Sequence, residues 1–157
     1  MTAFTFDIVE TAARSMETGV NSVTGQYELN GTAFDDDDTV GNITVPAGAV
    51  IKRVHLTTTE LDTNASPTLT LNVGDATDED RFIALATTGA ALNFTDINAS
   101  TITSNVIATG EGYEYLASDT DTTGEVGLIR VTGAAANATA ATTGHILLTI
   151  DYTVNQF

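Results

Sequence analysis

Apolar and polar residues alternate along most of the chain, with the period of two that is typical of strands half-buried in a sheet. The clearest case lies near the C-terminus, where Ile146, Leu148 and Ile150 alternate with polar neighbours. Glycine, proline, asparagine and aspartate interrupt the alternation at short intervals, as turn residues do. The pattern predicts strands over residues 23–29, 40–45, 50–60, 69–73, 82–85, 102–109, 113–117, 125–132 and 146–154.

The first 20 residues are the least strand-like part of the chain. Val9, Ala12 and Met16 fall at helical spacing ahead of the break at Gly19. This spacing fits a short helix, and an extended arm fits equally well; a frayed terminus is the simplest alternative. We therefore expect an N-terminal arm or short helix over residues 1–20, followed by a single β-sandwich domain over residues 21–157.

Eight or nine short strands, with no helices between them to connect parallel neighbours, predict an all-β fold. An antiparallel β-sandwich, jelly-roll-like in its topology, is the architecture that such a pattern favours. A sandwich leaves strand edges open to pairing with other chains. Lysines on edge strands commonly prevent this, but the chain has a single lysine, Lys52. Burial of those edges in an oligomer is one solution.

The charge balance limits the partners of the chain. Its 21 acidic side chains outnumber five basic ones, which gives a net charge of −16. Lysine and arginine supply most of the affinity for phosphate, so this surface should repel nucleic acids and anionic membranes. The chain has no cysteine, and we find neither a signal peptide nor an apolar stretch long enough to span a membrane.

Catalytic constellations are missing from the sequence. The only histidines are His55 and His145, and the motifs of serine hydrolases and zinc hydrolases do not occur. Carboxylates are plentiful, but they lie in apparent loops without the apolar surroundings that would raise a pKa. We therefore expect no enzyme activity, no catalytic residues and no cofactor.

Acidic loops raise the question of calcium. Asp119 to Gly124 begins like an EF-hand loop, but its twelfth position is Arg130 instead of glutamate. The segments Asp35–Asp38 and Asp75–Asp80 are interpreted as solvated connections between strands. No metal site is predicted, while a looser calcium-binding loop stays open as an alternative.

Several turn and strand segments resemble those of the capsid decoration, or cement, proteins of tailed bacteriophages, which have a jelly-roll domain. They are Val45–Ile51 (VPAGAVI), Leu71–Asp75 (LNVGD), Asp80–Ala84 (DRFIA) and the final strand Ile150–Val154 (IDYTV). The resemblance covers roughly residues 20–155. It implies a homotrimer on the outer surface of the virion capsid that binds the major capsid protein and stabilises contacts between its subunits. It also implies synthesis in the host cytoplasm.

Docking surfaces on the capsid or another partner are expected where the few basic residues lie. These are the N-terminal segment with Arg14, and one face of the long strand with Lys52, Arg53 and His55. The competing function is that of a receptor- or glycan-binding β-sandwich of a phage fibre or tail. Its sugar platform would be Tyr113 and Tyr115, since sugars stack on exposed aromatic side chains.

Overall fold

The computed structural model describes residues 2–12, 20–65, 68–75, 77–84, 101–106, 113–114, 128–136 and 139–154. These residues form strands and connecting loops, and none of them is in a helix that could cross a membrane. Nine strands have three or more residues, and β7 and β9 have two each. The strands are β1 Ala3–Thr5, β2 Asp7–Ala12, β3 Val20–Glu28, β4 Thr39–Thr44, β5 Ala49–Thr58, β6 Thr70–Gly74, β7 Ile83–Ala84, β8 Thr101–Val106, β9 Tyr113–Glu114, β10 Leu128–Ala135 and β11 His145–Val154.

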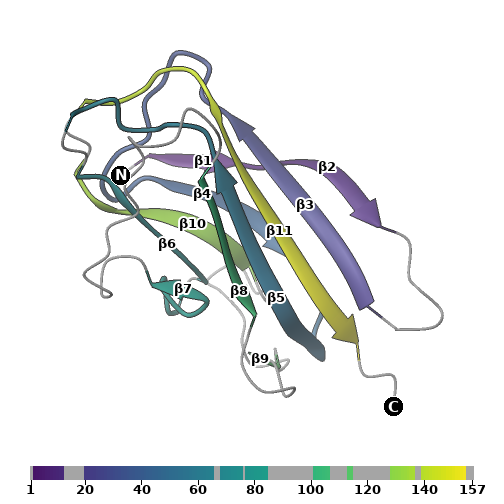
Figure 1. Cartoon of the computed structure of the whole chain (residues 1–157). Coiled ribbons are helices and arrows are strands. Elements are labelled where there is room, and N and C mark those ends of the chain that lie inside the picture. Colours follow the sequence, from purple (N-terminus) through teal and green to yellow (C-terminus); the bar gives the residue numbers. More distant parts are fainter. Residues whose placement is uncertain are drawn as a thin grey trace.

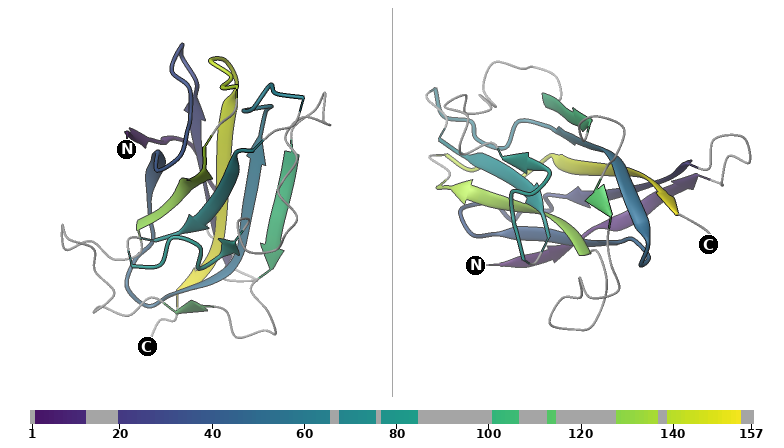
Figure 2. Two further views of the ribbon diagram at one scale, coloured as in Figure 1. Left: turned by 90° about the vertical axis from the view of Figure 1, so that its left-hand side faces the viewer. Right: turned by 90° about the horizontal axis from the view of Figure 1, so that it is seen from below.

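The strands make two sheets that pack on each other, which confirms the predicted β-sandwich (Figure 1). One sheet has the strand order β1-β4-β10-β6-β7, and the other has the order β2-β3-β11-β5-β8, with β9 pairing to β5. Every pair is antiparallel except β1 with β4. Figure 2 shows the two layers from two further directions.

The core lies between the sheets and follows from the alternation of the sequence. In β5, Val54 and Leu56 are at most 1% exposed, as predicted for the inward face of this strand. In β11, Ile146, Leu148 and Ile150 are fully buried. The opposite sheet contributes its own inward side chains to the same cluster, from β4, β6 and β10. Burial of this continuous apolar layer is the main force that holds the sheets together.

The N-terminal segment joins both sheets, and residues 3–12 adopt the extended structure that the sequence left open beside a helix. These residues are extended: β1 pairs with β4 in one sheet, and β2 pairs with β3 in the other. The period of two set by Phe4 and Phe6 prevails over the helical spacing that begins at Val9. Phe6 is 5% exposed and lies over Gly25, where an added Cβ would come within 2.7 Å of the Phe6 Cβ.

Most connections cross from one sheet to the other, so the loops gather at the ends of the sandwich. The loops 29–38, 59–69 and 136–144 connect β3 to β4, β5 to β6 and β10 to β11. Backbone hydrogen bonds join them, for example from Leu29 N to Gly144 O (2.8 Å) and from Ala141 N to Leu61 O (2.9 Å). We call this group of three loops the loop end of the molecule.

Candidate functional site

The outer side of the six-stranded sheet carries most of the residues expected to dock on a partner. We call the outward side chains of its three middle strands the sheet face. They alternate with buried positions on β3, β11 and β5, and therefore point away from the core. The sheet face consists of Ser22, Thr24, Gln26, Glu28, Arg53, His55, Thr57, His145, Leu147, Thr149 and Asp151.

Lys52 and Arg53 lie at a bulge that the sequence did not reveal. Asp151 pairs with Arg53 and the next residue of β11 pairs with Ile51, so Lys52 is left without an opposite residue. Ile51 and Val54 are both fully buried, three positions apart. The bulge thereby lets Lys52 stay half-buried although strict alternation with Val54 would place it in the core.

A neighbouring strand partly neutralises the basic residues Lys52, Arg53 and His55, which we call the basic strip. Arg53 Nε donates to Asp151 Oδ2 at 2.8 Å, with the two side chains 48% and 16% exposed. One strand away, the hydroxyls of Thr24 and Thr149 share a hydrogen bond of 2.8 Å. His55 is opposite Thr149, half-buried, and its Nδ1 has no hydrogen-bond partner in the described structure. The sheet face therefore holds one unsatisfied polar atom near its centre.

Other candidate residues fall outside the described parts or on their margins. Arg14, Tyr115 and the segment Asp119–Gly124 lie outside the described residues. Tyr113 is on β9, which pairs with the start of β5. Arg130, the twelfth position of the EF-hand-like pattern, is in strand β10 opposite Gly74, so this position belongs to a sheet.

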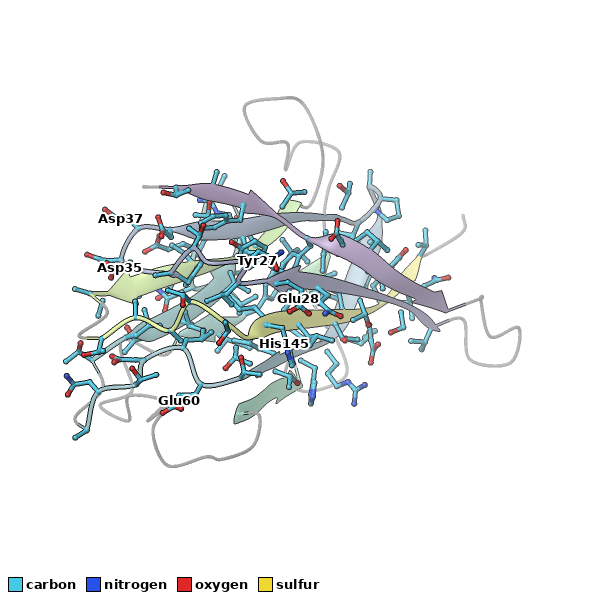
Figure 3. All side chains as sticks on the ribbon, turned by 90° about the horizontal axis from the view of Figure 1, so that it is seen from above. Tyr27, Glu28, Asp35, Asp37, Glu60 and His145 are labelled. Carbon is cyan, nitrogen blue, oxygen red and sulfur yellow. The ribbon has the colours of Figure 1, made fainter. Side chains whose placement is uncertain are left out.

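The loop end is acidic on its exterior. Asp35, Asp36, Asp37 and Glu60 are exposed, and the described residues of the three loops include no lysine or arginine. Figure 3 shows Asp35, Asp37 and Glu60 on loops at the same end of the sandwich. Such a group of exposed carboxylates repels other acidic surfaces, at distances up to about 8 Å at physiological salt.

Asp38 departs from the prediction of a solvated acidic loop. It is 7% exposed, and its carboxylate accepts hydrogen bonds from Thr2 N (2.6 Å) and Asp35 N (3.1 Å). These bonds anchor β1 and close the loop, so the carboxylate has a structural role. Burial, and secondarily the charge of Asp38, raises the pKa of Tyr27 above its ordinary value of 10.0.

The turn between β6 and β7 is also more ordered than predicted. Asp75 is 5% exposed and accepts hydrogen bonds from the backbone N–H groups of Thr77 and Asp78, both at 3.0 Å. Arg81 Nε donates to the same carboxylate at 2.7 Å. The prediction of a solvated connection is wrong at this residue, because the turn supplies both donors and a cation. Farther along, the hydrogen bond with Asp78, followed by burial, raises the pKa of Asp80.

Asp62 organises the loop end from inside. Its side chain is fully buried and accepts hydrogen bonds from four backbone N–H groups. Burial raises the pKa of Asp62, but these four hydrogen bonds lower it by more, so the pKa lies below the ordinary 3.8. The donors are the amides of Asn64 (3.1 Å), Thr68 (2.8 Å), Leu69 (3.2 Å) and Thr139 (3.2 Å).

The groups of the sheet face are of the kind that docking surfaces use. Within the described residues, no three histidine or carboxylate side chains are placed to hold a metal ion. The buried carboxylates accept hydrogen bonds from backbone N–H groups. The sheet face offers hydroxyls, an imidazole and one ion pair. Such a surface can bind another protein through shape and hydrogen bonds.

No protein-family model matches the chain, and no curated protein matches it either. Solved structures do match the chain, and two of them are of phage capsids. These matches relate the chain to phage capsid proteins.

One match is a chain in the structure of the cyanophage Pam1 capsid asymmetric unit. It has 29% sequence identity and a TM-score of 0.62, over 94% of each chain. The other is a chain in the capsid of Ralstonia phage GP4, with a TM-score of 0.67 over 99% of this chain and 100% of that one. At 19% identity, the second match shows a shared fold alone.

Proposed function

We propose that this protein is a capsid decoration, or cement, protein of a bacteriophage. In this role it forms a homotrimer on the outer surface of the head, binds the major capsid protein and stabilises contacts between its subunits. It acts as a structural protein without enzyme activity, and it contacts neither nucleic acid nor membrane. It is made in the host cytoplasm and ends as part of the virion.

The likeness to a chain of the Pam1 capsid asymmetric unit carries this proposal, because it extends over nearly the whole of both chains. A match that covers 94% of each also means that the two chains have similar lengths. The acidic composition and the β-sandwich fit a protein that stays outside a shell filled with DNA. Arg14, Lys52, Arg53 and His55 are the residues proposed to dock on partners.

Binding to heads tests the proposal. Heads of the phage that encodes this chain are prepared without it, incubated with purified protein and sedimented. We expect the protein to sediment with the heads at a fixed stoichiometry, and DNA release on heating to shift to a higher temperature. Because many copies act together, modest contacts by each copy suffice for a measurable shift.

A protein that stays in the supernatant at every concentration would contradict the decoration function. Binding to host cells or glycan arrays, without binding to heads, would favour the fibre or tail alternative. The matched control is isolated tails, to which a head decoration protein should not bind.

A further inference from the structure

Strand β1 leaves one side of its backbone unpaired. It is an end strand of the five-stranded sheet, so among the described strands it has a neighbour only on its β4 side (Figure 1). On that side Phe6 N donates to Gly41 O at 3.0 Å, and Thr2 O accepts a hydrogen bond from β4 at 2.9 Å. Successive residues of a strand direct their N–H and C=O groups to opposite sides, so those of Ala3 and Thr5 point away from β4. We call these outward backbone groups of Ala3 and Thr5 the β1 edge.

The β1 edge lacks the features that usually keep an edge strand from pairing with another chain. Natural proteins protect such edges with lysine, proline, β-bulges or inward-pointing charges. Residues 2–6 include no charged residue and no proline, and β1 pairs with β4 in an unbroken register. By contrast β2, an end strand of the other sheet, begins with Asp7 and has a bulge between Ile8 and Glu10. Of these two end strands, β1 is the one without such protection.

The strand that carries this edge is held firmly by the rest of the fold. Phe4 packs on Tyr27 with ring centroids 4.7 Å apart, and Phe6 is 5% exposed. Thr2 N donates to the buried Asp38 carboxylate at 2.6 Å. The residues between these anchors, whose backbone forms the β1 edge, are exposed. A partner strand therefore meets a preorganised edge, and this chain loses little conformational freedom on binding.

The surroundings of the β1 edge are acidic at both of its ends. Asp36 and Asp37 are exposed, in the loop that hydrogen-bonds the start of β1. Asp7 is exposed and comes two residues after the end of β1. Neither residues 2–12 nor the loop 29–38 include a lysine or arginine. Charges act over about 8 Å at physiological salt, so these carboxylates favour a positively charged partner.

A second copy of this chain fits the β1 edge poorly. If two β1 strands paired in antiparallel fashion, Asp7 of each copy would approach the acidic loop 29–38 of the other. In a parallel pair the two acidic loops would approach each other. In both directions carboxylates meet carboxylates, and such like-charge contacts disfavour an interface.

We infer that the β1 edge binds an extended, positively charged segment of a partner protein, which adds a strand to the five-stranded sheet. Main-chain hydrogen bonds supply the affinity in such strand addition, and the acidic surroundings select the charge of the partner. The identity of that partner as the major capsid protein rests on the proposed function.

The first test titrates the protein with a capped peptide of alternating lysine and threonine, followed by nuclear magnetic resonance. The backbone amide signals of Ala3 and Thr5 should move more than those of Phe4 and Phe6, because the latter two face β4. The matched probe is the same peptide methylated at its backbone nitrogens, which keeps the charge but loses the donors. It should bind about tenfold more weakly, the factor that corresponds to one or two lost hydrogen bonds.

The second test changes the backbone of the edge. Thr5→Pro removes a donor from the β1 edge but keeps the bonds to β4, because the Thr5 N–H points away from that strand. It should weaken binding of the peptide about tenfold while the chain still melts cooperatively. Ala3→Pro repeats the test at the other outward position, and Thr5→Val, which keeps the backbone, should bind like wild type. Asp7→Asn combined with Asp36→Asn should also weaken binding, and most clearly at low salt.

The outcomes separate this inference from the proposed function. Equal binding of the peptide by wild type and both proline variants overturns the inference, because charge alone would then hold the peptide. No binding by wild type, or binding that leaves the Ala3 and Thr5 amide signals unmoved, overturns it as well. Heads that sediment wild type and both proline variants equally would support the decoration function but refute the β1 edge as its contact. A wild-type chain that binds the peptide through the β1 edge but never sediments with heads supports the inference and refutes the decoration function.

Discussion

Removal of the Asp62 carboxylate should destabilise the fold more than any other single loss of charge in the described structure. The side chain is fully buried at the junction of the loops 59–69 and 136–144. Asp62→Ala leaves four backbone N–H groups without their acceptor, whereas Asp62→Asn keeps the shape and one acceptor oxygen. Both variants remove the charge, so the difference between them measures the lost volume and the second pair of hydrogen bonds.

The magnitude follows from how many of the four amides water can reach. The Leu69 amide is buried, while the other three are partly buried. If two amides stay unsatisfied, at about 1–3 kcal/mol each, Asp62→Ala lowers the free energy of unfolding by about 2–6 kcal/mol. That is a large share of the roughly 5–15 kcal/mol that a domain has in total. Asp62→Asn should cost about half as much.

Urea denaturation followed by circular dichroism measures these changes at pH 7. The matched control is Asp36→Ala, at an exposed position in the neighbouring loop, which should stay within about 0.5 kcal/mol of wild type. A loss below about 1 kcal/mol in Asp62→Ala would refute the reasoning, because it would mean that the four amides find water or new partners without cost.

Asp62→Asn should also change how the stability of the chain responds to acid. The pKa of Asp62 is lower in the folded chain than its ordinary 3.8, so the unfolded chain takes up the proton first as the pH falls. Its contribution to stability is present above about pH 4 and is lost as the pH drops through the folded pKa. Asp62→Asn should therefore lose less stability than wild type between pH 5 and pH 2, in thermal melts.

Three further changes test other parts of the fold. Arg81→Met leaves the nearly buried Asp75 without its cation and should cost about 1–3 kcal/mol in urea denaturation; a neutral result would show that the turn amides suffice. Gly74→Ala places a Cβ 2.1 Å from the Asp78 carbonyl oxygen, so it should lower the melting temperature by several degrees, and an unchanged melt would contradict this close approach. Burial, and then the nearby Asp38 carboxylate, raises the pKa of Tyr27, so Tyr27→Phe should remove a phenol that ionises above the ordinary 10.0 in an ultraviolet titration. Since the unfolded chain ionises more readily, wild-type stability should also fall as the pH rises above 10.

The sequence predicts a strand best where apolar and polar residues alternate strictly and the apolar side faces the core between the two sheets. β4, β5 and β11 lie close to their expected positions, because each has one apolar face that only the inside of a sandwich can bury. For the N-terminal segment the sequence left a helix and an extended arm open, because Val9, Ala12 and Met16 fit a helix. Phe4 and Phe6 determine the outcome, since both pack inward and strands present such a pair on one side.

Predictions about individual charges were less successful, for a physical reason. Their charge predicts that carboxylates lie in solvent, yet Asp38, Asp62 and Asp75 are all buried. Each accepts backbone N–H groups that a loop leaves unpaired, an arrangement that depends on the folded chain and offsets the cost of burial. A local signal did exist: Asp75 and Thr77 have the spacing at which an aspartate bonds the backbone two residues later.

The basic strip illustrates the same limit. Its residue types were visible in the sequence, but the pairing of Arg53 with Asp151, 98 residues apart, depends on the register of β5 against β11. The bulge at Lys52 likewise results from that register. Long-range pairing of strands therefore determines which charges are compensated and which surface can meet a partner.

The central position of β11 also bears on biosynthesis. β11 is the last described strand in chain order, yet it fills the gap between β3 and β5, which leave the ribosome about 90 residues or more earlier. Until it emerges, those two strands have unpaired edges that can pair with a neighbouring nascent chain. A truncated product lacking β11 would keep both edges open, so aggregation of incomplete chains is the failure expected during high-level synthesis.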